Sequence, residues 1–76
     1  MLILYTKNNC SHCDEVKKAF RSHRVVYEER NIINQKFLSE AQEKGARTMP
    51  FLVDTSANTV VGESDEIIDY VLEGSF

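Results

Sequence analysis

The chain has two cysteines, Cys10 and Cys13, which stand three positions apart in the sequence Cys-Ser-His-Cys. This spacing suits a dithiol that opens and closes one disulfide, with a thiolate as the attacking nucleophile. A metal site, two inert core cysteines and a structural disulfide are the other interpretations. Zinc needs about four ligands, and beyond the cysteines the chain offers only His12 and His23, with no second pair at finger-like spacing. Closing so short a loop stabilises a fold little, so the pattern favours a redox dithiol and no metal.

The residues around the pair predict a strand before it and a helix after it. Leu2–Tyr5 is a continuous apolar run, typical of a buried central strand. Ser11–His23 is amphipathic and predicts a helix with Cys13 on its buried face. The start of a helix carries unpaired N–H groups and the positive end of the helix dipole. We therefore expect Cys10 to be the nucleophile, held as a thiolate, and Cys13 to be the buried resolving thiol.

The charges beside the pair are positive, although the chain as a whole is acidic. Lys7 precedes Cys10 by three residues, and His12 lies between the two cysteines. A protonated imidazole and an ammonium group both stabilise a neighbouring thiolate, so His12 and Lys7 are predicted to modulate the reactivity of Cys10. The net charge of −3 argues against binding to nucleic acid.

The rest of the chain predicts further strands and helices in alternation. The expected elements are strands at Val25–Glu28, Phe51–Asp54 and Thr59–Val61, and helices at Gln35–Lys44 and Asp65–Leu72, the last with Ser64 as its N-cap and Ile68, Val71 and Leu72 facing the sheet. The order β-α-β-α-β-β-α predicts an α/β fold similar to thioredoxin, with a four-stranded mixed sheet and helices on both faces. A cysteine pair after the first strand agrees with the rule that sites in such sheets lie at strand carboxyl ends.

Length and composition indicate a single domain, 1–76, because 76 residues hold no more than one core. The chain has no apolar run long enough to span a membrane and no signal-like N-terminus. We expect a monomer in the reducing cytoplasm, where a cysteine pair is typically catalytic.

Three separated stretches resemble the glutaredoxin family. Tyr5–Cys13 is similar to that family's strand, lysine-containing loop and dithiol; Arg47–Pro50 is similar to its Thr-Val-Pro; and Val61–Asp65 is similar to its Gly-Gly-x-Asp turn. The resemblance spans nearly the whole chain. It implies a dithiol oxidoreductase in which Cys10 and Cys13 are catalytic, no cofactor is tightly bound, and glutathione is the co-substrate that restores the thiols after a protein disulfide is reduced.

The resemblance also implies which residues meet glutathione. They are Lys7, Thr48, Met49, Pro50, Gly62, Ser64 and Asp65. Lys7 would pair with the glycyl carboxylate, and the Ser64 and Asp65 N–H groups with the γ-glutamyl carboxylate. The side chain of Asp65 would bind the amine. Pro50 is implied to be cis and to hold the Met49 backbone toward the cysteines, free to pair with an extended thiol substrate.

The chain departs from the family pattern at three places, and two other functions stay open. Ser11-His12 replaces the frequent Pro-Tyr, Glu63 replaces a glycine beside the expected glutathione carboxylate, and Phe37 takes the place of a Gln or Arg. One alternative is a redoxin that donates electrons to ribonucleotide reductase and is recharged by thioredoxin reductase. The other is a dimer that binds an iron–sulfur cluster with glutathione as co-ligand, which Ser11 would permit.

Overall fold

The computed structural model describes residues 1–73, so the last three residues of the predicted domain, 74–76, lie outside the description. The elements are β1 (Leu2–Thr6), α1 (Ser11–Ser22), β2 (Glu28–Asn31), α2 (Gln35–Glu43), β3 (Phe51–Asp54), β4 (Thr59–Val61) and α3 (Ser64–Leu72). Their order is the predicted β-α-β-α-β-β-α. In this part of the chain, no helix combines the length and the apolar character needed to cross a membrane.

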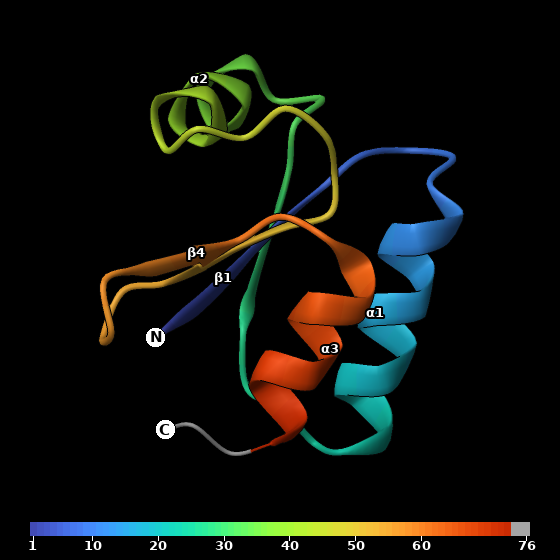
Figure 1. Cartoon of the computed structure of the whole chain (residues 1–76). Helices are drawn as coiled ribbons and strands as arrows, with labels where there is room; N and C mark the ends of the chain where they lie inside the picture. Colours follow the sequence, from blue (N-terminus) through green and yellow to red (C-terminus); the bar gives the residue numbers. More distant parts are fainter. Residues whose placement is uncertain (74–76) are drawn as a thin grey trace.

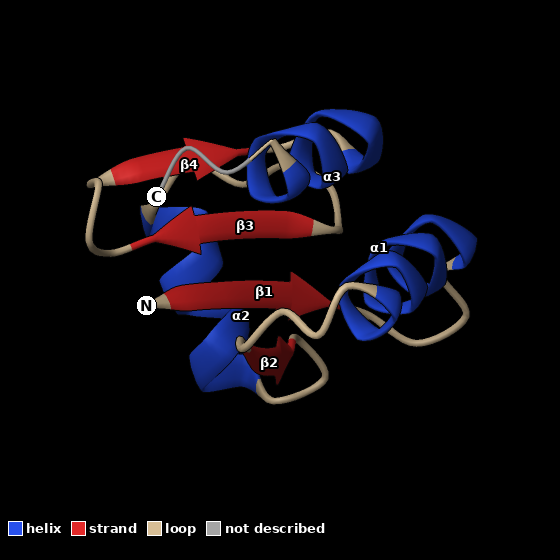
Figure 2. Cartoon of the chain, turned by 90° about the horizontal axis from the view of Figure 1, so that it is seen from below, coloured by secondary structure: helices blue, strands red, loops and turns tan. Residues whose placement is uncertain are grey.

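The sheet is mixed and has the strand order β2-β1-β3-β4 (Figure 2). β1 pairs in parallel with β2 and antiparallel with β3, while β3 and β4 form an antiparallel hairpin. All residues of β1 are buried, as the continuous apolar run predicted for a central strand. β1 ends at the loop that leads into α1, and this loop carries Cys10.

Helices cover both faces of this sheet (Figure 1). α1 and α3 lie on one face, where Leu4, Phe20 and Ile67 belong to one buried cluster. α2 covers the other face, where Tyr5 and Ala41 belong to a second cluster. Because successive strand residues point to opposite faces, β1 feeds both clusters, and this holds α1 in a fixed position relative to the sheet.

The second strand is not where the apolar pattern placed it, so the prediction of Val25–Glu28 is wrong. The strand is Glu28–Asn31, shifted toward the charged residues. Arg24 has a positive φ of 55° that turns the chain after α1, and the Val25 N–H donates to the Phe20 carbonyl at 2.9 Å. Val26 is 90% exposed. Residues 25–27 therefore form a connector in which Val25 and Tyr27 pack against the core cluster that includes α1. β2 is an edge strand whose polar side chains reach solvent and ionic partners.

Smaller differences occur at the helix ends. α3 begins at Ser64, with Glu63 as its N-cap and no side-chain capping bond, so Ser64 is not the N-cap. Ile67 is the fully buried residue of this helix, whereas Ile68 is half-buried, because the contact with α1 turns a different side of α3 inward. α1 and α2 each end one residue earlier than predicted, and β1 extends by one residue.

Candidate redox site

The two cysteines form a disulfide at the start of α1, with their Cα atoms 5.2 Å apart. Cys10 is the N-cap of the helix, and the Cys13 N–H donates to Cys10 Sγ at 3.1 Å. Cys10 is 8% exposed and Cys13 is completely buried. The first cysteine thus lies at the positive end of the helix and the second lies one turn inside, as the sequence predicted.

A groove of about 630 Å³ lies against this helix start. The residues that line it are Lys7, His12, Glu15, Thr48, Met49, Pro50, Gly62, Glu63, Ser64 and Asp65. They come from the β1–α1 loop, the first turns of α1, the segment before β3, and the N-terminal end of α3 with the two residues before it. Every residue predicted to meet glutathione is therefore brought to one hollow, although these stretches are far apart in the sequence.

The segment before β3 faces the disulfide. The Met49–Pro50 peptide bond is cis, as the family resemblance implied. The Met49 carbonyl oxygen lies 3.8 Å from Cys10 Sγ, and Pro50 is buried beneath it. A chain segment that brings its sulfur to Cys10 would therefore run alongside the backbone of Met49.

The charge of the groove differs from the positive surroundings that the sequence predicted for Cys10. Three carboxylates line it, and Lys7 is the one lysine among the lining residues. His12 does not stand free beside Cys10, because its Nδ1 lies 3.3 Å from an oxygen of Glu15. Asp65 accepts the N–H of Glu66 at 3.0 Å and Glu63 is exposed. The residue pattern did not predict Glu15 as a site residue, because it looks like any charge on the outer face of a helix.

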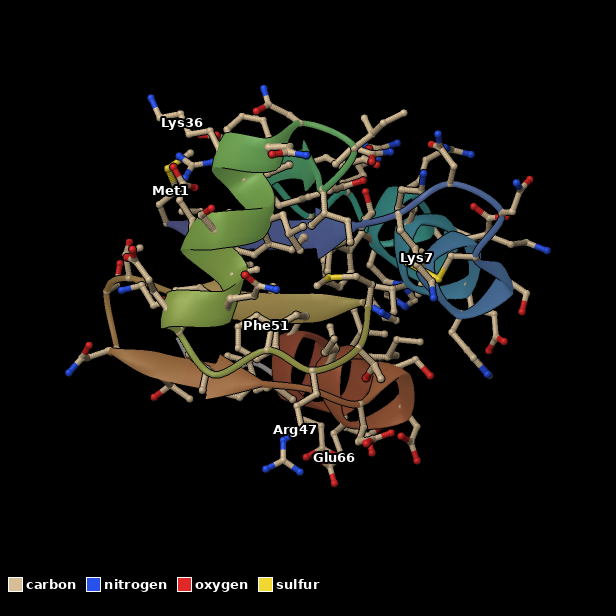
Figure 3. The ribbon with its side chains drawn as sticks, turned by 90° about the horizontal axis from the view of Figure 1, so that it is seen from above. Met1, Lys7, Lys36, Arg47, Phe51 and Glu66 are labelled. Atoms are coloured by element: carbon tan, nitrogen blue, oxygen red, sulfur yellow. A yellow bond between two sulfur atoms is a disulfide. The ribbon has the colours of Figure 1, made fainter. Side chains whose placement is uncertain are left out.

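No second cation from α2 reaches the groove in residues 1–73. Lys36 lies at the far end of the molecule from Lys7 (Figure 3). Phe37 is half-buried in the core cluster beneath α2, and the guanidinium of Arg30 sits 5.5 Å from the centre of its ring. Arg30 itself is engaged by Glu28 and by Glu40, the latter at 2.7 Å. The position at which the family places a Gln or Arg is thus apolar here and belongs to the core.

A polar contact that the sequence did not predict ties α1 to the sheet. The hydroxyl of Thr6 is fully buried and donates to Glu29 at 2.8 Å. The same carboxylate oxygen accepts from Lys17 at 3.2 Å, and Lys17 lies one helical turn after Cys13. These bonds join β1, β2 and α1 and so fix the first half of α1 relative to the sheet.

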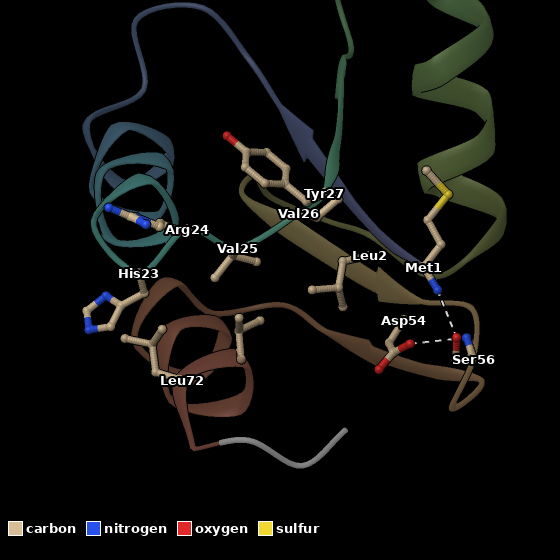
Figure 4. Close-up of a pocket in the computed structure, with 11 residues that line it drawn as sticks. Met1, Leu2, His23, Arg24, Val25, Val26, Tyr27, Asp54, Ser56 and Leu72 are labelled. Carbon is tan, nitrogen blue, oxygen red and sulfur yellow. Dashed lines mark hydrogen bonds between the residues drawn. The ribbon is translucent and has the colours of Figure 1, made fainter.

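A larger hollow of about 750 Å³ lies away from the disulfide (Figure 4). Apolar side chains such as Leu2, Val25 and Leu72 make up much of its wall, and it shares no residue with the groove. The Met1 amine donates to the Ser56 hydroxyl at its edge, at 2.8 Å. Within residues 1–73, no group of three or more His, Cys, Asp or Glu side chains is arranged to hold a metal ion.

The chain is similar to known proteins in sequence and in fold. Residues 4–75 match the family model described as glutathione S-transferase, N-terminal domain. The chain is 38% identical over 53 residues to the glutaredoxin-like protein NrdH of Lactococcus lactis subsp. lactis, covering 68% of this chain and 74% of the relative. The NrdH of L. lactis subsp. cremoris matches over the same shares at the same identity.

Solved structures agree at the level of the fold. A crystal structure of a thioredoxin-like protein superposes with a TM-score of 0.78 at 20% identity, covering 96% of this chain and 97% of the other. A structural genomics target from X. campestris superposes with a TM-score of 0.63 at 18% identity, covering 97% and 99%. The fold and the Cys10–Cys13 pair define a thiol–disulfide redoxin, a small protein that exchanges disulfides with its partners. The chain belongs to the glutaredoxin-like proteins of the thioredoxin superfamily.

Proposed function

We propose that this chain is a redoxin that reduces protein disulfides and is recharged by thioredoxin reductase, with ribonucleotide reductase as its protein partner. The similarity to two NrdH proteins supports this choice over a glutathione-dependent glutaredoxin. The observation that carries it is the carboxylate of Glu63, which lines the groove where the family has a glycine, while Lys7 is the one lysine among the lining residues.

The reaction follows from the positions of the two sulfurs. The Cys10 thiolate attacks one sulfur of a substrate disulfide, forms a mixed disulfide and releases the first substrate thiolate. Cys13 then loses its proton and attacks Cys10 Sγ, which releases the second substrate thiolate and closes the Cys10–Cys13 disulfide. The substrate gains two electrons and the redoxin loses two. A dithiol in the reductase then opens the disulfide by the same exchange in reverse.

The groove is unfavourable for glutathione because that tripeptide carries two carboxylates and one amine. Lys7 would neutralise one carboxylate, but the second would approach Glu63 at the turn where the family has a glycine. Like charges at short range cost binding free energy and lower the on-rate. A protein partner recognised through its backbone beside Met49 does not need those two cationic contacts.

Glutathione remains the second candidate reductant, since all seven residues predicted to bind it line the groove. Turnover of a protein disulfide should be measured with glutathione plus glutathione reductase, and in parallel with thioredoxin reductase. We expect turnover with thioredoxin reductase at least about tenfold faster. Comparable or faster turnover with glutathione would overturn the proposal and restore the glutaredoxin function.

The role of Glu63 has a direct test in the same assay. Glu63→Gly restores the glycine of the family turn and removes the carboxylate, so turnover with glutathione should rise several-fold. Glu43→Gln, at an exposed position of α2 outside the groove, is the matched control. It should change neither the turnover with glutathione nor that with thioredoxin reductase. No gain for Glu63→Gly would show that something other than this charge keeps glutathione out. Brown colour in anaerobically purified protein would instead favour the iron–sulfur alternative.

A further inference from the structure

We propose that the groove selects an oxidised partner whose reacting cysteine is flanked by cationic residues, and that Glu63 and Asp65 are the residues that determine this specificity. The inference rests on the proposed function in one respect: a protein segment, and not only a small thiol, enters the groove. The chemical class of that segment is a peptide with lysine or arginine residues beside its oxidised cysteine.

The geometry confines the segment to a narrow space. Cys13 is completely buried, so the substrate disulfide must come to Cys10, against the carbonyl of Met49. A groove of about 630 Å³ holds only a few residues of an extended chain. The Debye length at physiological salt is about 8 Å, so charges on the lining residues and on a segment held against them act on each other with little screening.

The charges on these walls are predominantly negative and partly unpaired. His12 faces Glu15, which leaves Lys7, Glu63 and Asp65 as the groove charges without an opposite partner among residues 1–73. Arg47 and Glu63 both line a neighbouring hollow of about 180 Å³, and no ion pair joins the two within residues 1–73. Arg47 extends away from the disulfide, on the side of Glu66 (Figure 3). The N-terminal end of α3, with Glu63 as its N-cap and Asp65 in its first turn, therefore presents two carboxylates without an ion pair to the bound segment.

This pair has little structural reason to exist. Glu63 is the N-cap of α3 but makes no side-chain capping bond. Asp65 accepts the exposed N–H of Glu66 and gains from the helix dipole, which is worth only about 0.3–1 kcal/mol at an exposed helix end. Lysine or arginine side chains on a partner segment would neutralise both carboxylates and raise the association rate, whereas acidic flanks would be repelled.

A single-turnover experiment tests the inference without any physiological reductant, so its outcome is independent of whether thioredoxin reductase or glutathione recharges the protein. The chain is reduced with dithiothreitol, freed of it, and mixed with a short peptide carrying one cysteine as its mixed disulfide with 2-nitro-5-thiobenzoate. Two peptides are compared, identical except that lysines or glutamates flank the cysteine. Release of the coloured thiolate gives the second-order rate constant for attack by Cys10.

We expect the lysine peptide to react about tenfold faster at low ionic strength, and this ratio to fall toward one as salt is added. The double variant Glu63→Gln/Asp65→Asn should lower the ratio at least about threefold. The double variant Glu43→Gln/Asp69→Asn makes the same change of net charge at exposed positions outside the groove and should keep the ratio of the unaltered chain.

Three outcomes would overturn the inference. One is a ratio near or below one in the unaltered chain at low salt, which needs no variant to interpret. Another is an unchanged ratio in Glu63→Gln/Asp65→Asn. The third is an equal fall of the ratio in both double variants, which would assign the preference to the overall negative charge and not to Glu63 and Asp65.

Discussion

Cys10 and Cys13 share a disulfide but have different surroundings. Cys10 caps α1 at the edge of the groove, while Cys13 packs inside the core. The helix start favours negative charge on the Cys10 sulfur, and burial disfavours a thiolate at Cys13. The residue types alone predicted this division, because one cysteine precedes an amphipathic helix and the other falls on its apolar face.

This difference predicts opposite results for the two serine variants. Cys10→Ser should abolish reduction of a protein disulfide, because no reachable nucleophile is left. Cys13→Ser should still attack the substrate but should stop at the mixed disulfide, which mass spectrometry of the unreduced product would detect as a covalent complex. Finding the complex with Cys10→Ser instead would reverse the assigned order of attack.

At the scale of the elements, the apolar patterns predicted six of the seven elements in nearly their observed places, and β2 was the exception. Val25 and Tyr27 are apolar because they pack on α1, with the Phe20 and Tyr27 rings 5.0 Å apart, and not because they pair in the sheet. The polar residues 28–31 form the strand because they pair in parallel with residues 3–6 of β1. Single-sequence patterns report burial, and here burial and pairing fall on different residues.

The candidate site could be predicted from the sequence where a local signal existed. The cysteine pair follows from its own spacing, and the stretches around Pro50 and Gly62 followed from the family resemblance. Glu15 carried no such signal, and neither did the bond from Thr6 to Glu29, because both depend on how α1 lies against the sheet. Charges on the rim of a groove can be assigned to a site only when the fold shows which loops lie together.

The β3–β4 hairpin depends on a buried carboxylate. One oxygen of Asp54 accepts the Tyr70 hydroxyl at 2.7 Å, and the other accepts the N–H of Ser56 at 3.1 Å. The bond from Tyr70 holds the pKa of Asp54 below its usual value. A carboxyl group with a lowered folded-state pKa stabilises the fold above its unfolded pKa, and this contribution is lost as the pH falls through the folded pKa.

We therefore expect Asp54→Asn to lower the free energy of unfolding at neutral pH by about 2 kcal/mol. The difference from the unaltered chain should shrink below about pH 4, where the carboxyl group of the unfolded chain is protonated. Urea denaturation at several pH values measures the loss of unfolding free energy and its dependence on pH. Exposed Asp69→Asn is the control; a gap for Asp54→Asn that is the same at acidic and neutral pH would contradict the role of its charge.

At the scale of the whole molecule, two small core clusters on either side of one sheet stabilise the fold. Phe20 is among the largest fully buried side chains and joins α1 to the connector through Tyr27. A domain typically has about 0.1 kcal/mol of stability per residue, so a chain of this length has little reserve. The loss of one such side chain should consume a large part of it.

Phe20→Ala should therefore cost about 3–5 kcal/mol of unfolding free energy, the range for a buried aromatic residue. Val26→Ala, at a side chain that is 90% exposed, should cost less than about 0.5 kcal/mol. Urea denaturation monitored by circular dichroism compares the two. Similar losses for both variants would show that the connector, and not the interior of α1, limits the stability of the fold.

The larger hollow has a practical consequence through the residues that border it. Met1 and Leu72, close to the two ends of the described chain, both lie there, while the groove draws on entirely different segments. The disulfide site and Met1 therefore lie on different sides of the molecule. A reporter domain fused at Met1 would leave the groove beside Cys10 open to a partner.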